Sequence, residues 1–183
     1  MPYNVPTVTT NDISFGPAIM LAGAAGSTPS TNVGSITEDG ISIEITSEKR
    51  SISQGNPRVP VFAFSQAQGV MVKLTGIEWD YTNFARSLGA GVTTASASEE
   101  TFAMGGDPIL TEIALNIKHV MAVTGNTLDV YIWKAVSEGG LTIPFGQDEH
   151  QFEFSFMALR VSEDWGGTSL PIKERLMKIV RTL

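Results

Sequence analysis

Residues 34–55 have the sequence "GSITEDGISIEITSEKRSISQG", and the predicted fold depends on the pattern in this stretch. Ile41, Ile43 and Ile45 alternate with polar residues, and this period of two predicts a β-strand with one apolar face. A glycine-bearing turn precedes the strand, and a charged polar run follows it. The stretch therefore predicts a regular strand that leads directly into a long polar excursion.

That polar excursion is predicted to be a loop over about residues 47–60. Its candidate contact residues are Glu48, Lys49, Arg50, Gln54 and Arg58. A loop of roughly a dozen residues is uncommon in a compact domain unless it binds something. Residues 1–48 contain acidic side chains and no basic ones, so the basic loop is complementary in charge to another part of the same chain. The loop therefore predicts contact between two copies of the protein.

Several other stretches have the composition or the alternation of strands. They cover residues 61–65, 70–79, 113–118, 128–132 and 152–161, and residues 13–25 are predicted to hold a first strand and a loop. The strands 61–65 and 70–79 are expected to be separate, joined across residues 66–69. In the last stretch, Phe152, Phe154 and Phe156 share one face, and the other face is half apolar, which predicts partial cover on both sides. The sequence thus predicts a mainly β fold, an antiparallel β-sandwich or barrel.

One segment departs from the strand pattern, "DYTNFARSLG" at residues 80–89. Its apolar residues recur at helical spacing, Asp80 is suited to cap the start, and Gly89 is suited to end the helix. One short flanking α-helix is therefore predicted over about residues 80–89. Its apolar stripe includes Phe84 and Leu88, which are predicted to cover a sheet face or to contact a neighbouring subunit.

Composition and charge limit the classes of function. The 183 residues suit one domain, and 12 basic against 19 acidic side chains give a net charge of -7, which disfavours tight binding to DNA or to an anionic membrane. The absence of cysteine excludes disulfides, zinc ribbons and thiol catalysis. No stretch approaches the roughly 18 apolar residues of a membrane helix. A single domain without a membrane span is therefore expected.

Candidate catalytic chemistry is sparse, and no catalytic, cofactor or metal site is predicted. Asp148 and His150 are suited to share one face of a strand, but a solvated turn is the favoured interpretation because catalysis requires converging groups. Tyr131 and Trp133 share a strand face and form either an aromatic platform for sugars or bases or part of a subunit interface. The interface is preferred because Tyr and Trp are enriched there.

Five segments together resemble a known family. They are "VGSITEDGISIEI" at 33–45, "VMVKLTGIEWDYTNFARSLGAG" at 70–91, "TFAMGGDPILTEIALNIKH" at 101–119, "FEFSFMALRV" at 152–161 and "KIVRTL" at 178–183. In this order they resemble the major tail tube protein of long-tailed bacteriophages, which is related to the tube proteins of contractile tails and type VI secretion. The resemblance covers about residues 36–158 and has no counterpart for residues 163–176.

The resemblance implies a structural virion protein that self-assembles into hexameric rings. These rings stack into a tail tube, the conduit for DNA ejection, and each subunit lends strands to a continuous inner barrel. Residues 48–60 would reach the next ring, and Glu44, on the polar face of its strand, is the candidate lumen residue. Within the single domain of residues 1–183, an N-terminal arm over about 1–12 and a C-terminal extension over about 162–183 are expected.

The same resemblance implies partners and a location. The partners are the chain itself, other tail proteins (tape measure, terminator and distal tail proteins) and passing double-stranded DNA that is not bound tightly. The protein would be made in the host cytoplasm and reside in the virion tail. Two alternatives stay open: another virion structural protein, such as a head-completion or tail terminator protein, or a carbohydrate- or receptor-binding β-sandwich that uses Tyr131 and Trp133.

Overall fold

The computed structural model describes residues 16–106, 109–146 and 149–182. The predicted N-terminal arm over residues 1–12, and Asp148, lie outside the described residues. The strands are β1 (Ala18–Ala24), β2 (Thr31–Asn32), β3 (Ile36–Gln54), β4 (Val59–Gly76), β5 (Val92–Ala95), β6 (Glu100–Ala103), β7 (Ile113–Val120), β8 (Thr127–Ser137), β9 (Phe152–Ala158) and β10 (Lys178–Arg181). The helix α1 spans Tyr81–Leu88, and a 3₁₀ helix spans Ile172–Glu174. No helix in the described ranges is long and apolar enough to cross a membrane.

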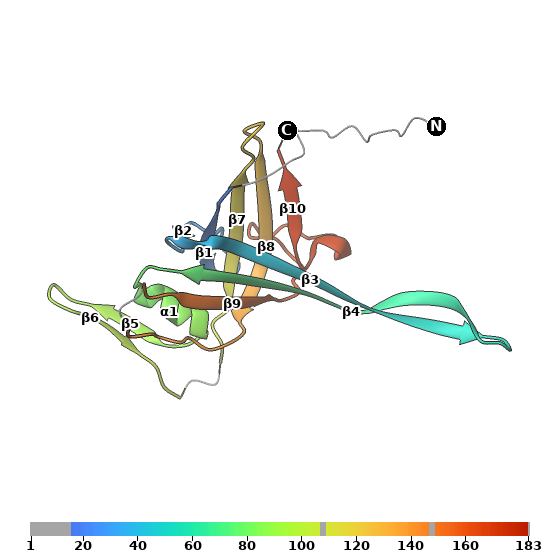
Figure 1. Cartoon of the computed structure of the whole chain (residues 1–183), viewed down its shortest axis with the longest axis horizontal. Helices are drawn as coiled ribbons and strands as arrows, with labels where there is room; N and C mark the ends of the chain where they lie inside the picture. Colours follow the sequence, from blue (N-terminus) through green and yellow to red (C-terminus); the bar gives the residue numbers. More distant parts are fainter. Residues whose placement is uncertain (1–15, 107–108, 147–148, 183) are drawn as a thin grey trace.

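An eight-stranded antiparallel sheet forms most of the protein, in the order β2-β1-β7-β8-β9-β4-β3, with β10 also paired to β8. Strand β8 belongs to both halves of the sheet, because its first part pairs with β10 and its last part pairs with β9. The sheet folds over at this strand, so that β7, β8 and β10 cross β3, β4 and β9 at a steep angle (Figure 1). The fold is therefore mainly β, antiparallel and sandwich-like with one helix, as the sequence predicts.

The core lies between the two halves of the sheet. The register places Ile43, Val72 and Phe156 side by side on one face, with Ile41, Leu74 and Phe154 in the adjacent row. Phe152, Phe154 and Phe156 are buried, so the prediction that they share the core face is confirmed. The prediction that the other face of this strand is covered is wrong for Glu153 and Met157, which are exposed, because none of the described elements packs over them.

The predicted loop over residues 47–60 is the far part of a long β-hairpin. Strand β3 continues to Gln54, and the two strands expected over residues 61–65 and 70–79 are one strand, β4. Irregularities in the pairing at Glu48/Lys49 and Ile52/Ser53 keep both strands in one ladder. The prediction of a loop is wrong because backbone hydrogen bonds hold a hairpin together even where its side chains lack an alternating apolar pattern.

The helix α1 agrees with the prediction in position and in both ends. Thr82 N donates to Asp80 Oδ1 at 2.8 Å, and Gly89 ends the helix in the left-handed conformation at φ 63°. A Cβ at Gly89 would lie 3.1 Å from Leu110 Cδ2, so glycine is also favoured by close packing. Buried in the core, Phe84 anchors the helix against Phe152, with a ring-centroid distance of 4.8 Å.

The C-terminal extension ends in the strand β10. Ile179 pairs with Val130 as β10 adds to the edge of β8. Before it, Trp133 Nε1 donates to Glu174 O at 2.8 Å, and Trp165 Nε1 donates to Trp133 O at 3.2 Å. The extension is thus fixed to the sheet by both backbone pairing and indole hydrogen bonds.

Candidate functional site

The most prominent surface feature is the far part of the β3–β4 hairpin, residues 46–68, which we call the arm. It projects away from the sandwich as a two-stranded ribbon (Figure 1). Every residue of the arm is exposed. Because its backbone pairs only within the hairpin from Thr46 to Gln54 and from Val59 to Gln68, the arm is a ribbon without a third strand in the described part of the chain.

One face of the arm is apolar. The register places Ile52 opposite Phe62 and Arg50 opposite Phe64, so these four side chains share a face. The rings of Phe62 and Phe64 stack at 6.1 Å, and the two residues are 61% and 39% exposed. A patch of this kind on a projecting ribbon is typical of a surface that another molecule covers.

The physical chemistry of a two-stranded ribbon supports the same interpretation. An isolated hairpin is at best marginally stable in water, and an exposed strand edge is a template for pairing with another chain. Val59 and Val61 add exposed apolar area at 53% and 56%. Contact with a partner would bury this apolar area and hold both strands of the arm in one conformation.

The charged residues predicted for this region lie on the arm. Lys49 and Arg50 are adjacent on β3 and therefore project to opposite faces, and Arg58 lies in the turn between the strands. Glu48 precedes them on β3, and Gln54 is the last residue of that strand. The arm thus combines an apolar face with basic side chains, whereas the chain as a whole has a charge of -7.

A second candidate surface is the open face of β3, β4 and β9 opposite the core. Glu44 lies on this face next to Met71, with Ser42 and Lys73 in the adjacent row. Lys73 Nζ lies 3.4 Å from Glu44 Oε2, and both side chains are more than half exposed. The further charged residues around this face are Asp39, Glu138 and Glu153. Acidic groups thus outnumber the lysine on an open polar sheet face.

The aromatic residues predicted for a platform or interface are largely covered by the chain itself. Trp133 is 7% exposed, and it stacks with Tyr131 at 5.5 Å and contacts Trp165 at 5.0 Å. A binding platform needs exposed rings, so Trp133 does not present one. Phe84 is 0% exposed because its ring fills the protein's own core, so the prediction that it covers a sheet face is confirmed and its place among the candidate subunit-interface residues is wrong. Leu88 is half-buried on the same helix.

The histidines take structural positions. His119 Nδ1 lies 2.9 Å from Pro17 O. The ring of His150 packs against Trp79 at 5.6 Å, within a partly exposed aromatic group that includes Phe145. In residues 16–106, 109–146 and 149–182, no three His, Asp or Glu side chains gather in a way that would hold a metal ion. Sequence reasoning missed this aromatic group because Trp79 lies far along the chain from Phe145 and His150.

Comparison with known protein families finds no model that matches the chain, and comparison with characterised proteins finds no similar sequence.

Proposed function

We propose that the chain is a structural virion protein that self-assembles into stacked hexameric rings and forms the tube of a phage tail. The arm is the observation that carries this proposal. It exposes Ile52, Phe62 and Phe64 beside basic side chains on a ribbon that has no partner strand in the described residues. A self-assembling protein needs such a surface, whereas an enzyme or a monomeric binding module does not.

The geometry of the sheet is consistent with a tube. Strands β3, β4, β9 and the end of β8 lie side by side. If each of six copies contributed these four strands, about 24 strands spaced about 4.8 Å apart and tilted roughly 40° would have a perimeter on the order of 150 Å. The backbone diameter would be about 48 Å, and side chains would leave a bore that admits a DNA duplex. The arm continues two of these strands, so it would leave the rim of the barrel and overlap the next ring.

The open polar face of the same strands would then line the bore. Glu44 and Glu153 on this face repel phosphates, which would allow DNA to pass without adhering. The partners under this proposal are further copies of the chain, the tape measure, terminator and distal tail proteins, and passing double-stranded DNA.

Negative-stain electron microscopy of the purified protein over a concentration series tests the proposal. We expect stacked rings or hollow tubes that increase with concentration. Single rings that never stack would instead favour a head-completion or terminator protein. A persistent monomer at high concentration would overturn self-assembly.

A receptor- or glycan-binding module is the second candidate function, favoured by the exposed aromatic group. Trp79 is 42% exposed and Phe145 is 83% exposed, and their rings lie 5.9 Å apart. Aromatic faces of this kind stack on sugars in many binding sites. A glycan screen with wild type and Trp79→Ala would detect this activity, and binding that Trp79→Ala abolishes in a monomeric protein would replace the tube proposal.

A further inference from the structure

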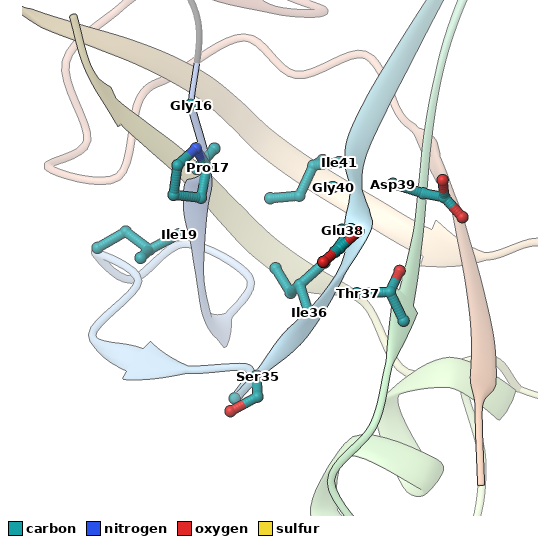
Figure 2. A pocket seen from close by; sticks show the side chains of 12 residues that line it. Gly16, Pro17, Ile19, Ser35, Ile36, Thr37, Glu38, Asp39, Gly40 and Ile41 are labelled. Atoms are coloured by element: carbon teal, nitrogen blue, oxygen red, sulfur yellow. The ribbon is translucent and has the colours of Figure 1, made fainter. Parts of the chain in front are cut away.

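A cleft of about 770 Å³ opens where the start of β1 faces the start of β3; we call it the edge cleft. Figure 2 shows Pro17 and Ile19 on one side and Ile36 and Ile41 on the other. Ile19 is 49% exposed, although it belongs to a sheet strand. The cleft therefore has apolar walls that the described residues, 16–106, 109–146 and 149–182, leave open to solvent.

Both strands that border the edge cleft have unpaired backbone edges. In the described residues, β2 pairs only with Leu21 and Ala22 of β1, and β3 is the last strand of the sheet order. Between Ile36 and Ile41 the pairing of β3 with β4 is also interrupted. Unpaired strand edges beside apolar walls are a template for an added strand or ribbon.

The charged residues that line the edge cleft are acidic, and one of its polar groups is unsatisfied. Glu38 and Asp39 are exposed lining residues, and Asp39 projects from the other side of β3 (Figure 2). Thr37 Oγ1 is buried without a hydrogen-bond partner in the described residues. Lys118 on β7 lies beside Ile19 of the cleft wall in the register, and it lies across from Asp129 of β8 on its other side. The cleft thus favours a partner with basic and apolar side chains and free backbone groups.

The arm of a second copy has this chemistry. It presents Arg50 and Arg58 together with Ile52, Val59 and Phe62, and both outer edges of its ribbon are unpaired in the part of the chain that the structure describes. We propose that the tip of the arm of one copy docks in the edge cleft of the next copy. This inference rests on the proposed function, because it names the surface that receives the arm.

The distance along β3 makes this contact intermolecular. The edge cleft lies at the first residues of β3 and the arm tip follows its last residue, Gln54. At about 3.3 Å per residue, the two sites are roughly 50 Å apart along the strand. The arm tip and the edge cleft lie at opposite ends of β3, so docking between copies is a head-to-tail contact. Such contacts add copy after copy to an open filament, unless the rotation between copies closes them into a ring. The docking therefore builds a stack in which all copies point in the same direction. The step between successive copies is at most the length of β3 between the cleft and the arm tip, roughly 50 Å.

Variants of the cleft and of the arm test the docking. Ile19→Glu and Glu38→Lys alter the cleft, with Val92→Glu (wild-type side chain 65% exposed) and Glu100→Lys as matched controls on other strands. Phe62→Ser alters the arm. Equal circular dichroism spectra and melting temperatures would establish that the variants fold. We expect each cleft variant to raise the concentration needed for tube growth by about tenfold or more, and the controls to leave it unchanged.

A mixing experiment separates the docking from self-assembly as such. Copies with a defective cleft keep a sound arm, and copies with a defective arm keep a sound cleft. In an equimolar mixture, the sound arm of the Ile19→Glu variant can dock only in the sound cleft of the Phe62→Ser variant. We therefore expect assembly to end at pairs of chains or pairs of rings, as detected by native mass spectrometry and microscopy. If wild type and both cleft variants form normal tubes, the docking site is refuted and the proposed function stands. If wild type stays monomeric, both are refuted.

Discussion

At the residue scale, two phenylalanines differ in exposure and therefore in their expected contribution to stability. Phe84 is 0% exposed inside the core, whereas Phe62 is 61% exposed on the arm. We expect Phe84→Ala to lower the free energy of unfolding by about 3–5 kcal/mol, because it removes a buried ring and leaves a cavity. Phe62→Ala should change it by less than about 0.5 kcal/mol in the monomer, because the ring is exposed. Urea unfolding of both variants tests this, and equal losses would contradict the placement of Phe84.

The cap of α1 is a second prediction at this scale. Asp80→Ala removes the acceptor for Thr82 N and is expected to lower the free energy of unfolding by about 1 kcal/mol. Asp39→Ala is the matched control, since Asp39 is exposed on β3 and is not the cap of α1. A shift in the urea midpoint for the first variant alone would support the cap, and no shift in either would exclude it.

At the element scale, the arm is separable from the sandwich. Replacing residues 48–67 by Asn-Gly keeps the part of the hairpin that pairs with β9 and favours a tight turn. We expect the melting temperature of the monomer to change by only a few degrees, because the arm contributes no buried residue to the core. Tube growth should be lost completely. Tubes formed by the shortened protein would refute the role of the arm.

The C-terminal extension offers a second test at this scale. Trp133→Phe keeps an aromatic ring but removes the hydrogen bond to Glu174 O, so faster amide exchange is expected over residues 172–181. A loss of about 1 kcal/mol in unfolding free energy should accompany it. Trp79→Phe is the control at an exposed indole. Unchanged exchange in Trp133→Phe would show that pairing of β10 alone holds the extension.

At the scale of the whole molecule, the charge of the open sheet face makes a prediction about DNA. Reversing Glu44 and Glu153 to Lys should leave tube formation intact, because neither lies on the arm, but tubes should then retain short DNA duplexes in co-sedimentation. Glu100→Lys, on β6, is the control for added positive charge elsewhere. Retention by the control and the double variant alike would count against a lumenal face, and retention by the double variant alone would support it.

Assembly as a whole is expected to depend on salt. Basic side chains of the arm and acidic side chains of the edge cleft attract each other over distances that salt screens. Lys49→Glu together with Arg50→Glu should block tube growth at low salt with the fold intact. Normal tubes from that variant at every ionic strength would show that electrostatic attraction does not contribute to docking and that the apolar contacts alone carry it.

Much of the fold was predictable from local patterns. The alternation in Ile41–Ile45 and in Phe152–Phe156 predicts strands because one face is buried, and Asp80 and Gly89 predict both ends of α1 because caps act locally. The position of Glu44 on a polar sheet face follows from the same alternation. These features depend on near neighbours in the chain.

Local patterns misjudge features that depend on distant partners. The residues 47–60 lack a core-facing pattern, so they resemble a loop, yet pairing between β3 and β4 makes them a ribbon. The alternation of its strand suggests that Trp133 is exposed, but Glu174 and Trp165, from a later part of the chain, cover it in the structure.

The alternating strands around Ile41–Ile45 and Phe152–Phe156, the helix with its caps and the acidic charge follow from the sequence, because each arises from propensity, periodicity or composition along the chain. Two further features could be seen only in the folded protein: the basic segment is a projecting arm, and an apolar, acidic cleft lies at the other end of the same strand. Both depend on which strand edges remain unpaired once the sheet has folded, and that is a property of long-range pairing.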